Sequence, residues 1–175
     1  MFWSRWRRGG RPAVATGRAL YAAAAAQARE PTFYAGLGVP DTANARFELY
    51  SLHVILLLHR LKTQAEGGDE IGQALFDTYL SALDDALREQ GVGDLSVGKS
   101  MRRLGEAFYG RVRSYDSALA APAELEPLLA KTVYADAAVP PAALAAYALR
   151  AVALLQQQAD TAVAEGRVDW PVILT

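Results

Sequence analysis

Residues 91–100, which read GVGDLSVGKS, constrain the fold most, because their two interpretations require different architectures. From Gly93 onwards they match the phosphate-binding pattern G-x-x-x-x-G-K-[ST], which follows a buried strand of a parallel sheet. In the second interpretation they join two helices, with Gly91 and Gly93 in the turn and Asp94 or Ser96 capping the second helix. The first interpretation requires an α/β fold and the second suits an all-α fold.

The residues before this stretch favour the turn between helices. Large apolar side chains repeat there every four residues, as on one face of a helix. They are Leu75, Tyr79, Leu83 and Leu87. A buried strand would be a short run rich in Val, Ile and Phe, and no such run ending in a magnesium-binding Asp occurs elsewhere in the chain. We therefore interpret the phosphate-binding pattern as a chance match, and a nucleotide hydrolase is the less favoured alternative.

The helix that follows the turn is predicted to be amphipathic and strongly basic. Its apolar stripe consists of Val97, Met101, Leu104, Phe108, Tyr115 and Leu119. The remaining surface carries Lys99, Arg102, Arg103, Arg111 and Arg113.

Turn signals divide the rest of the chain into further helices, so we predict an all-α fold: a single globular domain of about six helices with a basic N-terminal tail. The expected helices begin near residues 20, 42, 69, 94, 122 and 140, and the last runs to Glu165 before Gly166 closes it. Asp41 or Thr42 is expected to cap the second, and Pro127 to kink or restart the fifth. The expected boundaries are 1–18 for a flexible tail and 19–175 for the helical domain. The apolar run 47–58 falls short of the roughly 20 residues that cross a bilayer, which predicts a buried helix.

Composition excludes several kinds of chemistry. The chain contains no Cys, which removes disulfides, thiolate metal sites and Cys nucleophiles. Its only imidazoles, His53 and His59, would lie about 240° apart around a helix, which does not suit one shared metal ion. The acidic residues of the third helix occupy ordinary surface positions. We therefore expect no catalytic residues, no metal and no cofactor.

The N-terminus is distinctive in its charge. The first 29 residues contain six Arg and no acidic residue, which leaves twelve basic and nineteen acidic residues in the remainder. Within the first eight residues, aromatic side chains alternate with Arg, and such a segment suits either a tether to an anionic membrane surface or a disordered basic tail. The residues expected to meet a membrane surface are Trp3, Arg5, Trp6, Arg7 and Arg8. Ribosomal RNA would attract the same charge.

Two blocks of the sequence resemble a known family. The first is residues 19–62, ALYAAAAAQAREPTFYAGLGVPDTANARFELYSLHVILLLHRLK, and the second is residues 87–119, LREQGVGDLSVGKSMRRLGEAFYGRVRSYDSAL. Together they resemble the ubiquinol-cytochrome c chaperone family, whose members assist assembly of the cytochrome bc complex. The resemblance covers roughly residues 20–119, and the C-terminal third resembles the family only as an Ala-rich helical extension.

The resemblance implies a role without catalysis, in which the protein binds newly made cytochrome b at the membrane until haem insertion and subunit joining proceed. It implies a cytoplasmic protein, peripheral at the inner membrane of a bacterium or on the matrix side in a mitochondrion. A small helical partner protein or the ribosome would be further partners, with no specific nucleic acid. The alternative function is a membrane-surface or ribosome-associated adaptor.

The expected contact surface for a client is the turn and the basic helix that it begins. It comprises Asp94, Lys99, Arg102, Arg103, Tyr109, Arg111 and Tyr115. An alternative remains open for these positions, because a run of charges is usually a solvated helix face. The glycines of this region, Gly91, Gly93, Gly98 and Gly110, would equally serve close approach between helices.

Overall fold

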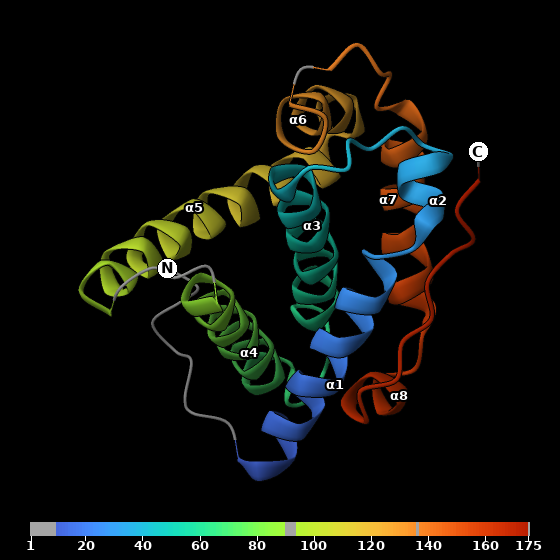
Figure 1. Cartoon of the computed structure of the whole chain (residues 1–175). Coiled ribbons are helices and arrows are strands. Elements are labelled where there is room, and N and C mark those ends of the chain that lie inside the picture. Colours follow the sequence, from blue (N-terminus) through green and yellow to red (C-terminus); the bar gives the residue numbers. More distant parts are fainter. Residues whose placement is uncertain (1–9, 90–93, 136, 175) are drawn as a thin grey trace.

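A computed structural model describes residues 10–89, 94–135 and 137–174, and the side chains of these residues except Leu87 and residues 94–100. In these residues the protein is helical and contains no strand (Figure 1). The helices are α1 (Arg11–Gln27), α2 (Pro31–Ala35), α3 (Ala43–Leu61), α4 (Gly68–Glu89), α5 (Asp94–Ala120), η2 (a 3-10 turn, Pro122–Glu124), α6 (Leu125–Thr132), α7 (Ala142–Gln157) and α8 (Asp160–Ala164). The all-α prediction is confirmed, and each of the six expected helices is present.

Helix α3 is the centre of the molecule. Most of its residues are buried, including the run from Leu52 to Leu58, and α1, α4, α5 and α7 all pack against it. Thr42, one of the two expected caps, caps the helix, since its hydroxyl accepts a hydrogen bond from the amide of Ala45 at 3.2 Å. An apolar helix surrounded by other helices buries its whole circumference, which explains why its sequence is not amphipathic.

In the part of the chain that the structure describes, no helix is both long enough and apolar enough to span a membrane.

The elements that meet at residues 91–100 are both helices, as the second interpretation requires. Helix α4 ends at Glu89 and α5 begins at Asp94, while the turn residues 90–93 lie outside the described residues. A helix rather than a strand leads into the phosphate-binding pattern, so that pattern lacks the architecture it requires. In Figure 1, α5 begins beside the end of α4 and then runs towards α3 and α6.

The first helix begins earlier than expected, because α1 starts at Arg11 and not near residue 20. Ala13 and Thr16 are buried, and the Thr16 hydroxyl donates to the carbonyl of Ala164 in α8 at 2.6 Å. Tertiary contacts therefore extend this helix into the segment that composition assigned to a tail. A short helix not predicted from the sequence, α2, fills the segment after Pro31 and buries Phe33.

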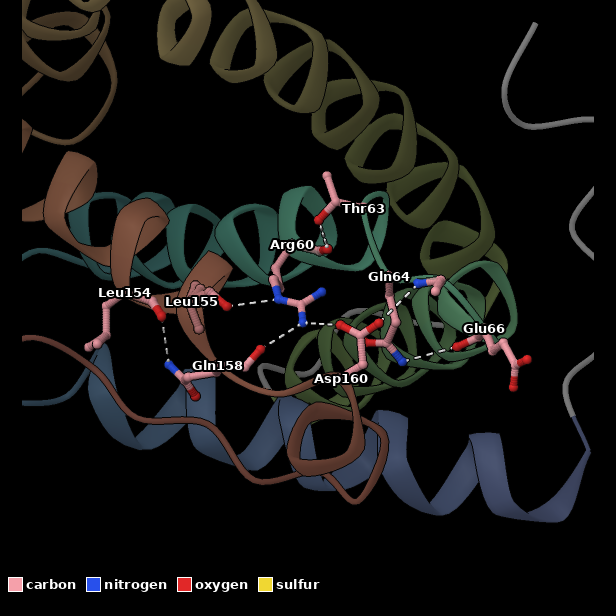
Figure 2. A network of polar contacts seen from close by, with 9 residues as sticks. Arg60, Thr63, Gln64, Glu66, Leu154, Leu155, Gln158 and Asp160 are labelled. Atoms are coloured by element: carbon pink, nitrogen blue, oxygen red, sulfur yellow. Dashed lines mark hydrogen bonds and ion pairs between the residues drawn. The ribbon is translucent and has the colours of Figure 1, made fainter.

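The expected last helix is divided in two. Gln158 and Ala159 adopt extended backbone between α7 and α8, whereas a continuous helix to Glu165 was predicted. The break leaves the carbonyl oxygens of Leu155 and Gln158 free to accept hydrogen bonds from the buried Arg60, at 2.8 and 3.0 Å (Figure 2). Asp160, at the start of α8, accepts a third bond from this guanidinium at 2.5 Å. The residues at the break therefore supply hydrogen-bond acceptors and a counter-charge to the buried guanidinium of Arg60.

The proline positions near residue 122 agree largely with expectation. Pro122 begins the short helix η2, and α6 follows it directly. Pro127 lies in the first turn of α6, where a missing amide proton costs little, so it does not kink the helix.

Candidate functional site

Aromatic side chains attach α5 to the rest of the molecule. Phe108 of α5 stacks on Phe76 of α4 with ring centroids 5.5 Å apart, and its centroid lies 4.6 Å from that of Tyr79. Tyr109, expected as a contact residue, is half-buried and packs against Phe76 with centroids 5.2 Å apart. Part of the Tyr109 ring therefore supports the α4–α5 interface.

Arg111 forms an ion pair with a buried carboxylate. Its Nη2 lies 2.7 Å from Oε1 of Glu48 and its Nε lies 2.9 Å from Oε2, which makes a bidentate pair between α5 and α3. The side chain of Glu48 is only 5% exposed and that of Arg111 is 38% exposed. The hydrogen bonds to Glu48 raise the pKa of Arg111 above its ordinary value. The positive charge of Arg111 is therefore paired with Glu48 inside the folded protein.

Tyr115 does not belong to the exposed surface, which corrects the expectation that its ring offers contact area. The ring is fully buried, and its hydroxyl bonds to that of Thr132 in α6 at 3.1 Å. Burial raises the pKa of Tyr115 well above the ordinary value for a phenol. Its position on the apolar stripe of the helix explains this burial.

Among the predicted contact residues whose side chains the structure describes, Arg102 and Arg103 are exposed cations. The side chain of Arg102 is 83% exposed, and it pairs with Glu106 one turn later at 3.1 Å. Such a surface pair contributes little to stability, so it can be exchanged for a contact with a partner. Asp94 and Lys99 belong to the first turns of α5, but their side chains lie outside the described residues. The five membrane-surface residues, Trp3, Arg5, Trp6, Arg7 and Arg8, also lie outside them.

A groove of about 890 Å³ lies where α1, α2, α3, α4 and α5 meet, and the sequence analysis did not anticipate it. Its lining is mostly alanine and aromatic side chains, with few charges. The lining residues are Tyr21, Ala25, Ala28, Arg29, Pro31, Tyr34, Ala35, Asp41, Arg46, Phe47, Tyr50, Ala82, Leu83, Ala86 and Leu104. Leu104 connects the groove to the predicted surface, because it follows Arg103 directly in α5. No single segment of the sequence signalled it, because its lining is drawn from five helices.

The polar groups of the groove are unequally satisfied. Arg46 binds Asp41 at 2.5 Å and lies over the ring of Tyr34, 5.9 Å from its centroid. Tyr34 donates its hydroxyl to the carbonyl of Ala28 at 2.9 Å. The hydroxyl of Tyr50, in contrast, is buried and has no hydrogen-bond partner among the described residues.

The two histidines occupy separate environments. His53 is buried, and its Nδ1 donates to the carbonyl of Leu49 at 2.8 Å while Nε2 accepts from the Tyr147 hydroxyl at 3.0 Å. His59 is half-buried and contacts Asp116 at 3.3 Å. Within the described residues, no three His, Cys, Asp or Glu side chains form a group that could hold a metal ion.

Comparison with known proteins identifies relatives of this chain. The sequence profile described as ubiquinol-cytochrome C chaperone matches residues 35–170. The match continues beyond residue 119, so the C-terminal helices belong to the family region, whereas only a weak resemblance was expected there. The crystal structure of the Cbp3 homolog from Brucella abortus superposes with a TM-score of 0.81 at 35% identity, covering 91% of this chain and 90% of that one.

A curated vertebrate protein is also similar. It is the ubiquinol-cytochrome-c reductase complex assembly factor 1 of Xenopus laevis, which is 25% identical over 87 residues. The aligned region is 50% of this chain and 44% of the Xenopus protein, so the chain matches less than half of that relative's length. With a profile match over most of its length and a closely similar solved fold, this chain belongs to the ubiquinol-cytochrome c chaperone family.

Proposed function

We propose that this protein is a non-enzymatic assembly chaperone of the ubiquinol-cytochrome c reductase complex that binds newly made cytochrome b. The observation that carries the proposal is the family match over residues 35–170. The similar Xenopus protein, named as an assembly factor of the same complex, supports it. The client is held until haem insertion and subunit joining, so the chaperone requires a reversible contact rather than a catalytic centre.

Features of the described residues support a binding role. The α4–α5 corner presents exposed cations, Arg102 and Arg103, beside a groove lined with apolar side chains. An exposed apolar groove flanked by charge is typical of a surface that binds another protein. The proposal also places the protein at the surface of the membrane that contains cytochrome b.

The test is co-purification from gently solubilised membranes. Tagged wild-type protein is expected to enrich cytochrome b, identified by mass spectrometry, and Arg102→Glu, Arg103→Glu is expected to reduce this enrichment. Both side chains are exposed, so the substitution leaves the core unchanged.

A matched control changes the same amount of charge elsewhere. Lys131→Glu in α6 with Arg167→Glu after α8 also reverses two cations away from the corner and is expected to enrich cytochrome b as the wild type does. Failure of folded wild-type protein to enrich cytochrome b would contradict the proposed function. Equal loss in both double variants would show that general charge, rather than the corner, governs the result.

A further inference from the structure

The walls of the groove are built to admit another helix. Five of the lining residues are alanines, namely Ala25, Ala28, Ala35, Ala82 and Ala86. Small side chains allow two helix backbones to approach closely, as at helix interfaces in general. Phe47, Tyr50 and Tyr21 add ring surface, on which apolar side chains of a bound segment lose their contact with water.

The charges of the groove favour a negatively charged group. Its charged lining residues are Arg29, Arg46 and Asp41, which leaves one positive charge in excess. Asp41 neutralises Arg46 through their 2.5 Å contact, whereas Arg29 forms no ion pair with any residue that the structure describes. Burial raises the pKa of Tyr21, while the nearby Arg29 lowers it and Asp85 raises it, so both charges act on this wall of the groove.

Tyr50 lines the same groove, but its hydroxyl is buried and closed to solvent, so only its ring is available to a bound segment. The guanidinium of Arg29 is exposed and can donate two hydrogen bonds to the two oxygens of a carboxylate.

We propose that this groove binds an apolar helical segment of the client that carries one carboxylate side chain, with Arg29 as its ion-pair partner. The inference rests on the proposed function and assigns the site and the chemistry of the recognised segment. An acidic residue within an apolar segment is costly until it finds a cation, so a chaperone that supplies Arg29 stabilises the unassembled form.

A chain segment fits this site better than a small molecule. Sites for small molecules enclose most of the ligand surface, whereas this groove is only partly enclosed. It is bounded by the C-terminal parts of α1 and α4 and the start of α3, which are rigid walls suited to a helix in a groove.

The direct test measures binding of two synthetic peptides by fluorescence anisotropy. Both are Leu- and Ala-rich helices with Lys at their ends, and one carries a single central Glu where the other carries Gln. Wild-type protein is expected to bind the Glu peptide about tenfold more tightly, the effect of one charged hydrogen-bonded pair. Arg29→Gln is expected to remove this preference, and Arg18→Gln, an exposed cation of α1 outside the groove, to retain it.

A second pair of variants tests the groove itself. Ala86→Phe fills it and is expected to weaken both peptides, whereas Ala146→Phe on the exposed side of α7 is expected to weaken neither. Thermal unfolding followed by circular dichroism checks that each variant is folded. Equal affinity of wild type for the two peptides, or unchanged binding by folded Ala86→Phe, would overturn the proposal.

Co-purification separates this inference from the proposed function. If Arg29→Gln and Ala86→Phe enrich cytochrome b as well as the wild type does, the groove proposal fails and the function stands. If the wild type selects the Glu peptide but does not enrich cytochrome b, the proposed function fails, and the groove retains its preference for an acidic helix that belongs to another protein.

Discussion

His53 shows how burial of one side chain sets the response of the whole protein to acid. Its ring lies against Phe33, Tyr147 and Trp170, with centroids 5.3, 5.7 and 5.1 Å away. Burial lowers its pKa from 6.5 to about 4. Since the unfolded chain takes up a proton at higher pH than the folded one, the free energy of unfolding decreases as pH falls from 6.5 to about 4.

The expected loss through His53 is about 3 kcal/mol once the pH is below this window. Urea unfolding of the wild type between neutral pH and pH 4 measures it, and His53→Gln provides the comparison. The variant is expected to be less stable at neutral pH, because the packing around the ring is lost, but to depend less on pH. Parallel pH profiles for the two proteins would show that other groups cause the acid sensitivity.

Single residues also show which contacts cannot be predicted from the sequence. The sequence suggests that Arg60 is an ordinary basic residue at the end of α3. Its side chain is instead buried and donates hydrogen bonds to the carbonyl oxygen of Leu155 and to the carboxylate of Asp160. Local pattern contains no information on a partner so far along the chain. The division of the last helix, which depends on this contact, could therefore not be predicted. The cap at Thr42 rests on neighbouring residues and was one of the two positions predicted for it.

At the scale of the elements, close approach of α1 and α4 depends on Gly17. A Cβ atom at this position would lie 2.7 Å from backbone and side-chain atoms of Ala74 and from the amide nitrogen of Leu75. Gly17→Ala is expected to force the helices apart and lower the free energy of unfolding by about 1–3 kcal/mol. Chemical denaturation measures the change.

The matched controls are glycines of α5. A Cβ atom added at Gly105 or Gly110 would have no neighbour within 4 Å, so alanine there is expected to stabilise the helix by up to about 1 kcal/mol. This result would also exclude the close-approach alternative considered for Gly110. A Gly17→Ala variant as stable as the wild type would contradict the tight contact between α1 and α4.

Element positions were largely predictable because each depends on local signals. Periodic apolar residues, a cap and prolines predicted α3, α4, α5, η2 and α7. The groove could not be predicted in the same way, because five helices contribute to it and the sequence does not specify their arrangement. For the same reason the sequence did not reveal that Arg111 pairs with Glu48 from another helix.

At the scale of the molecule, charge separates the N-terminus from the rest of the chain. After residue 29 the chain has twelve basic and nineteen acidic residues, so an anionic surface repels most of the protein. The first nine residues contain Arg5, Arg7 and Arg8 beside Trp3 and Trp6. We therefore predict that this segment governs any affinity for anionic lipid.

Deletion of residues 1–9 is the variant that tests the prediction, and it leaves α1 intact because the helix begins at Arg11. Each cation near an anionic surface contributes about 1 kcal/mol, so removing three is expected to weaken binding to phosphatidylglycerol vesicles about a hundredfold. Sedimentation with vesicles measures this loss. Neutral phosphatidylcholine vesicles and added salt, which screens the attraction, are both expected to abolish the difference between the two proteins. Equal binding of the shortened and complete chains to anionic vesicles would assign the affinity to the folded domain, and the exposed cations of α5 would then be the next residues to replace.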